Sequence, residues 1–280
     1  MVQAGKLSKD FVTVITGGSG GIGKVIARKM LELGSKVVLV GRSKKSLDEA
    51  RKDLASINLR TVTASVEKWP EVSKFFKKLG RVDMLVNAAG VYGPIGKFGD
   101  SDLREWSEAI QINLIGTANC IYAVLPQMVK RRQGKIVNFS GGGAVQPFPN
   151  FSAYAISKAA VVRFTENLAV EYKDKNIQCN SIAPGAVNTK FLERVMSAGK
   201  KNAGEEFYKK SLQQKASGGD SPELAADLVA WLSNPKNKLT GKLISAKWDE
   251  WKEIDPDKVN KSNLYTLRRI DNQFYEERKK

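Results

Sequence analysis

The sequence predicts an α/β fold, a doubly wound parallel sheet in a three-layer α/β/α sandwich. Short runs of apolar and β-branched residues alternate with amphipathic helical patterns along most of the chain, and this alternation is typical of parallel strands joined by right-handed helical crossovers. A glycine-rich loop follows the first run, and several later runs end in small or polar residues. Open sheets of this kind bind ligands at the carboxyl ends of their strands. At 280 residues, the chain can bury the core of one large domain.

The first predicted strand and helix flank the glycine-rich loop. Residues 11–16 are suited to a buried strand, and a helical pattern with Val25, Ile26 and Met30 on one face follows the loop. Glycine permits a tight turn and lets the backbone approach a diphosphate, whose charge is met by free amides and the positive end of the helix. The loop therefore predicts dinucleotide binding, as opposed to a simple turn, through Gly17, Ser19, Gly20, Gly21, Ile22 and Gly23.

The second predicted strand, residues 36–40, ends in Gly41 and Arg42. In dinucleotide folds an acidic residue at this point holds the ribose hydroxyls of NAD, whereas an arginine accommodates the 2′-phosphate of NADP. Gly41 stands where the acid would be, so we expect Arg42, with Ser43 beside it, to bind a 2′-phosphate. The sequence thus favours NADP(H) over NAD(H). The alternative is that Arg42 is a solvated charge flanking a helix.

Two further strands and a long helix follow. Residues 59–64 and 82–86 predict the third and fourth strands, and the latter ends in Asn-Ala-Ala-Gly at 87–90. Small residues there would let a ribose and a nicotinamide lie against bare backbone. A helical pattern over 102–130 carries the polar Asn113 in its apolar interior. A buried amide is costly unless it is hydrogen-bonded, so Asn113 is expected to have a protein or water partner.

The fifth predicted strand, residues 135–140, delivers Ser140 at its carboxyl end, where ligands bind. Three glycines and an apolar loop follow it. Together with the loop after the fourth strand, this segment predicts a largely apolar substrate pocket. Its expected wall residues are Tyr92, Ile95, Gly142, Val145, Phe148 and Phe151.

Tyr154 and Lys158 are spaced four residues apart at the start of the next predicted helix. Side chains at i and i+4 share a helical face, about 6 Å apart along the axis. A lysine charge held near a phenol in a cleft stabilises the phenolate and lowers the pKa of the tyrosine from its usual value near 10. The pair therefore predicts a tyrosine that transfers protons, although the same spacing also occurs on ordinary solvated helix faces.

The last third of the sequence is less regular. Residues 177–183 predict a sixth strand that leads into a turn at 184–189. The irregular, Lys-rich segment 189–220 is expected to be a mobile substrate lid inserted in a single domain over 1–246. A last strand at 239–245 precedes a C-terminal extension over 247–280, in which an amphipathic helix is expected at 264–277.

Composition and charge narrow the possible functions. The net charge is +17, but lysines are spread along the chain among acidic residues, which favours a solvated surface over nucleic-acid binding. Without histidine, His-based triads and most zinc sites are excluded, and no metal is expected. Cys120 and Cys179 lack metal-ligand spacing and are expected to be reduced. No stretch approaches the roughly 18 apolar residues of a spanning helix. We therefore expect a cytoplasmic protein.

Taken together and in order, these motifs resemble those of the short-chain dehydrogenase/reductase (SDR) family. The resemblance spans residues 9–246 and implies a Rossmann-like fold with about seven parallel strands, a nicotinamide cofactor and a homotetramer or homodimer packed through the two long helices. The motifs that carry it are Thr16-Gly17-x-x-x-Gly21-x-Gly23, Asn87-Ala88-Ala89-Gly90, Asn113, Ser140, Tyr154-x-x-x-Lys158 and Pro184-Gly185.

The resemblance also implies roles for single residues. Tyr154 would protonate the carbonyl oxygen as hydride arrives, or act as the base in the reverse direction. Lys158 would lower the pKa of Tyr154 and hold the nicotinamide ribose. Ser140 would hydrogen-bond the substrate oxygen, and Asn113 would anchor a water that relays protons to Lys158. The ribose and carboxamide would be framed by Asn87, Ala88, Gly90, Pro184, Gly185, Val187 and Thr189.

Two positions depart from the family pattern. An aspartate often follows the third strand and contacts the adenine, whereas this chain has Ser65 followed by Val66. The contact through Ser65 is therefore less secure, although Val66 can still pack on the ring. The usual Asn-Asn-Ala-Gly reads Asn-Ala-Ala-Gly at 87–90, which is a tolerated variant.

These features predict an NADP(H)-dependent oxidoreductase that reduces a carbonyl or oxidises the matching secondary alcohol. The apolar walls and the basic residues Lys190, Lys200 and Lys201 favour an acyl-bearing anionic substrate such as a 3-oxoacyl thioester. A sugar or another small ketone is the alternative substrate. A non-catalytic NADP-binding or scaffold protein is the alternative of another class.

Overall fold

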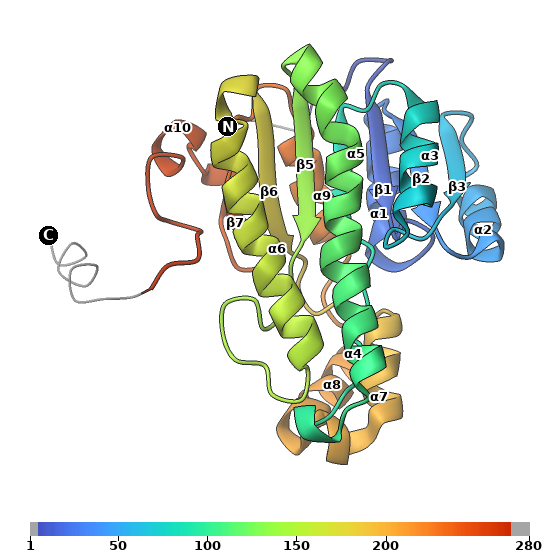
Figure 1. Ribbon diagram of the computed structural model, residues 1–280, viewed down its shortest axis with the longest axis vertical. Coiled ribbons are helices and arrows are strands. Elements are labelled where there is room, and N and C mark those ends of the chain that lie inside the picture. Colours follow the sequence, from blue (N-terminus) through green and yellow to red (C-terminus); the bar gives the residue numbers. More distant parts are fainter. Residues whose placement is uncertain (1–4, 270–280) are drawn as a thin grey trace, which may run out of the picture.

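The computed structural model describes residues 5–269 as a three-layer α/β/α sandwich (Figure 1). Within that range seven parallel strands form one sheet in the order β3-β2-β1-β4-β5-β6-β7. Its topology reverses between β1 and β4, which is where open α/β sheets bind ligands. The strands are β1 (Val12–Thr16), β2 (Lys36–Gly41), β3 (Leu59–Thr63), β4 (Met84–Asn87), β5 (Gly134–Phe139), β6 (Ile177–Ala183) and β7 (Leu243–Ser245).

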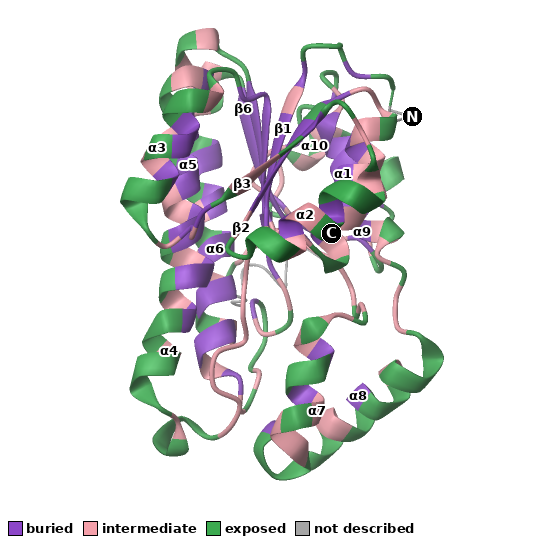
Figure 2. Ribbon diagram, turned by 90° about the vertical axis from the view of Figure 1, so that its right-hand side faces the viewer, coloured by how far each residue is buried: buried purple, intermediate pink, exposed green. Residues whose placement is uncertain are grey.

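Two sets of helices cover the sheet. One apolar core lies between the sheet and α1, α2 and α9, and a second lies between the sheet and α3, α5 and α6. The buried strands run between these layers in Figure 2. The helices of the sandwich are α1 (Gly21–Glu32), α2 (Lys44–Leu54), α3 (Trp69–Leu79), α4 (Leu103–Ile110), α5 (Gly116–Arg131), α6 (Ser152–Glu171) and α9 (Glu223–Ser233), with short 3₁₀ turns η1 (Phe98–Asp100) and η3 (Lys173–Lys175).

The helix expected over 102–130 is interrupted. A π-helical segment, η2 (Gln111–Ile115), separates α4 from α5 and contains the buried Asn113. Gly116 follows this segment and packs closely against the loop between β3 and α3, since an added Cβ would lie 2.5 Å from Val66 Cγ2. By length and composition the stretch Leu103–Arg131 would also pass as a membrane span, contrary to expectation, but half of its apolar window is buried inside the protein. A core helix against the sheet accounts for that pattern.

The segment expected to be irregular, 189–220, is largely helical. It forms α7 (Lys190–Ala203) and α8 (Glu205–Ser217), which project beyond the carboxyl edge of the sheet (Figures 1 and 2). Gly199 has a φ of +72° and breaks α7 internally. Their outward faces are polar and exposed, whereas α7 turns Phe191, Val195 and Met196 toward the cavity and α8 turns Phe207 toward it.

The residues after β7 pack back on the sandwich. They form η4 (Trp251–Glu253) and α10 (Pro256–Val259), and the Leu243 backbone N–H of β7 donates to the Tyr265 carbonyl at 2.8 Å. The buried Glu166 of α6 accepts hydrogen bonds from the Leu267 N–H at 2.7 Å and from Arg268 at 3.4 Å. Residues 264–269 are therefore not helical as expected at 264–277. The remainder of that expected helix lies outside the described residues.

Candidate active site

A cavity of about 1620 Å³ lies at the carboxyl edge of the sheet, where the loops after β1, β2, β4, β5 and β6 meet. Its size exceeds the roughly 300–1,000 Å³ of common small-molecule pockets, leaving room for a dinucleotide and a substrate. Most of the predicted site residues line it. They are Gly17, Ser19, Gly20, Gly21, Ile22, Gly23, Arg42, Ser43, Val66, Ala88, Gly90, Ser140, Gly142, Val145, Phe148, Tyr154, Lys158, Pro184, Gly185, Val187 and Thr189.

Three of the predicted catalytic and cofactor-binding residues do not line the cavity. Ser65 donates its backbone N–H to Glu71 at 2.8 Å, and Asn87 donates its side-chain amide to Asn138 at 2.9 Å. Asn113 binds both backbone groups of Val91, and its Nδ2 also donates to Ser157 Oγ at 2.9 Å. Ser65 is thus not placed for an adenine contact. The polar groups of the Asn113 side chain are used to tie the loop after β4 to α6.

The glycine-rich loop fits a dinucleotide diphosphate. Gly17 has a φ of +67°, and an added Cβ there would lie 2.8 Å from the Ala89 backbone. An added Cβ on Gly23 would lie 2.6 Å from the Gly17 carbonyl oxygen. Both glycines therefore allow a close approach of α1 and β4 to the loop. Because α1 begins at Gly21 with no side-chain cap, its first amides remain available to an anion.

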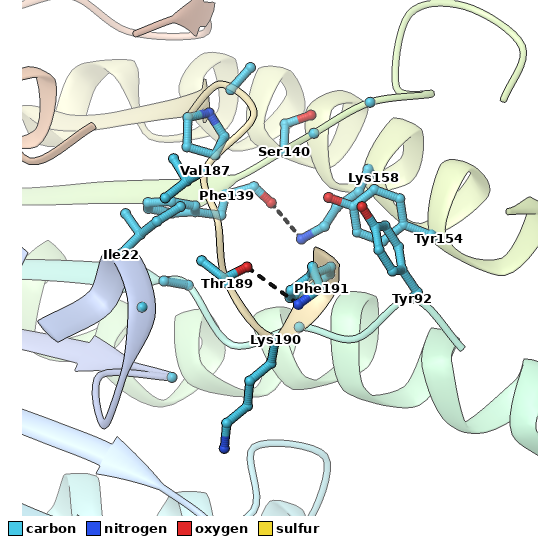
Figure 3. A pocket seen from close by; sticks show the side chains of 18 of the residues that line it. Ile22, Tyr92, Phe139, Ser140, Tyr154, Lys158, Val187, Thr189, Lys190 and Phe191 are labelled. Carbon is cyan, nitrogen blue, oxygen red and sulfur yellow. Dashed lines mark hydrogen bonds between the residues drawn. The ribbon is translucent and has the colours of Figure 1, made fainter. Parts of the chain in front are cut away.

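Tyr154 and Lys158 of α6 are both buried at the cavity wall, with 8% and 4% of their surfaces exposed. Lys158 Nζ lies 5.6 Å from the centre of the Tyr154 ring and donates to the Phe139 carbonyl oxygen at 2.7 Å (Figure 3). Burial lowers the pKa of Lys158 to about 8. Burial also raises the pKa of Tyr154. The expected lowering of the tyrosine pKa is therefore absent here, because desolvation by burial raises it and the neighbouring Tyr92 raises it further.

Ser140 does not hold the position expected of it. Its Oγ is buried and has no hydrogen-bond partner among the described residues, Tyr154 included. The next residue, Gly141, lies directly against the phenol, because an added Cβ there would overlap the Tyr154 hydroxyl. Figure 3 shows the Ser140 oxygen pointing away from Tyr154. The strand-end position that faces the tyrosine is thus 141.

Aromatic side chains form the substrate end of the cavity. The Tyr92 ring packs edge-on against Tyr154 at 4.8 Å and against Phe191 of α7 at 4.6 Å, measured between ring centres. Phe207 of α8 packs against Phe148 at 5.0 Å. Two predicted wall residues are wrong, because Phe151 is fully buried behind these rings and Ile95 lines a separate hollow.

Only one of the three basic residues predicted for the lid lies at the cavity. Lys190 lines the cavity, whereas Lys200 and Lys201 do not. Other wall residues come from late segments and carry no signal in the sequence, since only long-range packing brings them here. They are Phe191, Val195, Met196, Phe207, Ser211, Gln214, Asp220, Lys247, Trp248, Asp249, Tyr265 and Thr266.

A dinucleotide-type sheet with a glycine loop, and a buried tyrosine and lysine across the cavity from it, define a nicotinamide-dependent oxidoreductase. The family model of the short chain dehydrogenases matches residues 11–199. The chain belongs to this family.

Relatives and solved structures agree with that membership. The chain is 32% identical to the dehydrogenase/reductase SDR family member 4 of Sus scrofa, over 87% of this chain and 88% of the relative. It is 30% identical to the short chain dehydrogenase andI of Emericella variicolor, over 86% and 82%. A variant actinorhodin polyketide ketoreductase with NADPH is 27% identical, with a TM-score of 0.76 over 88% of this chain and 97% of that one. NAD⁺-bound xylitol dehydrogenase, at 24% identity and a TM-score of 0.78 over 85% and 98%, shows the shared fold.

Proposed function

We propose that the protein reduces a carbonyl group to a secondary alcohol with NADP(H), or catalyses the reverse, with Tyr154 as the general acid or base. The observation that carries the proposal is the pairing of Tyr154 and Lys158 in one buried cavity with the glycine-rich loop. When bound, the nicotinamide cofactor supplies or accepts the hydride. The chain's own residues orient the reactants, exclude water and move the proton.

The proton moves between Tyr154 Oη and the substrate oxygen. In reduction, the oxygen gains negative charge as the carbonyl carbon is reduced and takes the proton of the phenol, which leaves a tyrosinate. The protonated Lys158 amine, on the same helix face, stabilises that anion. The Phe139 carbonyl holds the amine in place at 2.7 Å. Burial of both groups strengthens their electrostatic interaction because water screens it little.

Arg42 supports the preference for NADP(H). It is exposed at the cavity wall directly after β2, where no acidic residue ends the strand to hold the ribose hydroxyls. The carboxylate of Glu49 also lines this end, about one and a half turns further along α2. The 2′-phosphate would therefore depend on Arg42 and on Ser43, whose Oγ accepts from the Ser46 N–H.

The Arg42→Ala variant tests this preference. A charge-assisted hydrogen bond is worth about 1.5–3 kcal/mol, so the Kd for NADPH should rise about 10- to 100-fold. The Kd for NADH should change little. Arg51→Ala, at an exposed arginine of α2 outside the cavity, is the matched control. Equal affinities of Arg42→Ala and the wild type for NADPH would contradict the assignment.

The substrate we favour carries an apolar or acyl group, with 3-oxoacyl thioesters as the first candidates. The rings of Tyr92, Phe148, Phe191 and Phe207 make the substrate end apolar. Lys190 is an exposed positive charge of the cavity wall whose side chain points away from Tyr92 and Tyr154 in Figure 3. The NADPH complex of a polyketide ketoreductase among the structural neighbours supports this choice. A sugar ketone is the second candidate, supported by the xylitol dehydrogenase only at the level of fold.

The non-catalytic alternative predicts tight NADPH binding without turnover. An assay of NADPH oxidation distinguishes the reductase from the non-catalytic binding protein. It uses an acetoacetyl thioester, an aryl alkyl ketone and a ketopentose as substrates, and NADH is tested in parallel. Consumption with one class identifies both the activity and the substrate. Binding of NADPH with no consumption in any case would favour the binding protein.

We further infer a homo-oligomer located in the cytoplasm. The outer faces of α5 and α6 expose Tyr122, Ile156 and Val170 at 70%, 53% and 77%, and large exposed apolar side chains on neighbouring helices suit a self-complementary interface. Cys120 and Cys179 are free and buried, in keeping with a reducing compartment. No nucleic-acid partner is proposed.

A further inference from the structure

The strand end after β5 offers no side-chain hydroxyl to a substrate oxygen. Ser140 Oγ is buried without a partner, and its neighbour Gly141, which lies against the Tyr154 hydroxyl, has no side chain. A carbonyl oxygen placed to receive the Tyr154 proton would therefore contact the Tyr154 hydroxyl but no hydroxyl from the end of β5. A second donor has to come from another element.

Tyr92 is the side chain that the structure offers. It follows the Asn-Ala-Ala-Gly turn after β4, lines the cavity, and has its ring fixed edge-on by Tyr154, Phe151 and Phe191 at centre distances of 4.8, 5.1 and 4.6 Å. The Tyr92 hydroxyl has no hydrogen-bond partner within residues 5–269, and the same holds for Tyr154. In the view of Figure 3 both phenol oxygens point toward the same part of the cavity as the Lys158 amine, and the two rings pack edge-on with 4.8 Å between their centres.

We propose that Tyr92 donates the hydrogen bond that holds the substrate carbonyl oxygen beside Tyr154. This inference rests on the proposed carbonyl reduction. Fixed rings on three sides pre-orient the donor, so little freedom is lost when the substrate oxygen arrives.

The two phenols then have different tasks. Tyr154 gives its proton to the oxygen as the carbonyl carbon takes up hydride, and Tyr92 keeps its proton and donates a hydrogen bond to the developing negative charge. Burial raises the pKa of Tyr92 to about 12, so that its hydroxyl remains a donor at neutral pH. A donor aimed at developing charge in a site without water contributes about 10²- to 10³-fold to kcat.

The Tyr92→Phe variant tests the proposal, because it removes the oxygen and retains the ring contacts. With the fastest substrate of the three-class panel, we expect kcat to fall about 100-fold while the KM for NADPH is unchanged. We expect calorimetry to show about tenfold weaker binding of the product alcohol to the NADP⁺ complex. Ser140→Ala should lose less activity than Tyr92→Phe. Tyr172→Phe, at the end of α6 and outside the cavity, is the matched control.

The possible outcomes separate this proposal from the proposed function. Wild-type kcat and alcohol affinity in Tyr92→Phe would overturn the role of Tyr92 and leave the reductase intact. A loss in Ser140→Ala as large as the one expected for Tyr92→Phe would assign the donor to Ser140 instead. Absence of both turnover and alcohol binding in the wild type would overturn the proposed function and this inference with it.

Discussion

At the scale of single residues, the balance between burial and charge at Tyr154 and Lys158 decides the chemistry. Both side chains are buried, and burial alone disfavours tyrosinate and ammonium alike. The Tyr154 tyrosinate forms only as the substrate oxygen accepts the proton. The Lys158 charge stabilises the site most at that moment, because it then faces an anion. A raised pKa of Tyr154 in the site without ligands is therefore compatible with its role as a general acid once substrate and cofactor are bound.

The pKa of Lys158 gives the account a pH dependence. Because burial lowers that pKa to about 8, the amine is charged below this pH and neutral above it. The charge stabilises the tyrosinate, so kcat for carbonyl reduction should be flat below about pH 7 and should fall above about pH 8. A pH profile at saturating NADPH measures this. A profile that stays flat to about pH 10 would contradict the role of Lys158.

Sequence reasoning located these residues but misjudged one neighbour. Tyr154, Lys158 and the glycine loop were predictable because helix periodicity and the strand-loop-helix order are local properties. The end of the fifth strand places Ser140 where ligands bind, and the family resemblance implies its hydrogen bond to the substrate oxygen. Which of two successive residues faces the cavity depends on how the chain leaves the sheet, and in the structure Gly141 faces Tyr154. No local pattern reveals that turn.

At the scale of elements, α7 and α8 are the part of the molecule that encloses the substrate end. Phe207 of α8 packs against Phe148 and Phe151, both at 5.0 Å between ring centres, and Phe191 of α7 packs against Tyr92. We propose that this helix pair acts as a substrate lid. The sequence predicts an irregular segment after the sixth strand, whereas the structure forms two helices there, and their role as a lid remains a proposal.

The lid is tested by Phe207→Ala. Loss of the ring removes the contact between α8 and the loop after β5, so we expect the KM for the carbonyl substrate to rise about tenfold, near 1.4 kcal/mol. The Kd for NADPH should stay the same, because the glycine loop lies elsewhere in the cavity. Leu212→Ala, also on α8 but exposed and outside the cavity, is the control. A change in Phe207→Ala confined to cofactor affinity would rule out the lid.

At the scale of the whole molecule, most of the fold was predictable and the assembly was not. Buried parallel strands appear as continuous apolar runs, so six of the predicted strands fall within a few residues of the observed ones. The last strand is shorter than expected, since Thr240 N–H donates to Asn260 of the C-terminal segment instead of a strand partner. That segment packs back on α6 through Glu166, a contact between residues about a hundred positions apart.

The proposed oligomer interface is tested by Val170→Glu. Val170 is 77% exposed on α6, so the charge should leave the protomer folded while opposing burial in an interface. Light scattering should then show a mass near that of the monomer, with an unchanged circular dichroism spectrum. Ile57→Glu, at a residue 99% exposed after α2, should retain the wild-type mass. A wild-type mass for Val170→Glu would place the interface elsewhere.

The central claim is that Tyr154 transfers the proton in an NADP(H)-dependent carbonyl reduction, and Tyr154→Phe addresses it most directly. NADPH oxidation should be measured for the wild type and the variant with the substrate that the wild type consumes fastest, together with the Kd for NADPH. The account predicts a loss of kcat of about 10²- to 10⁴-fold and a Kd within about twofold of the wild type. Turnover of Tyr154→Phe close to that of the wild type would contradict it.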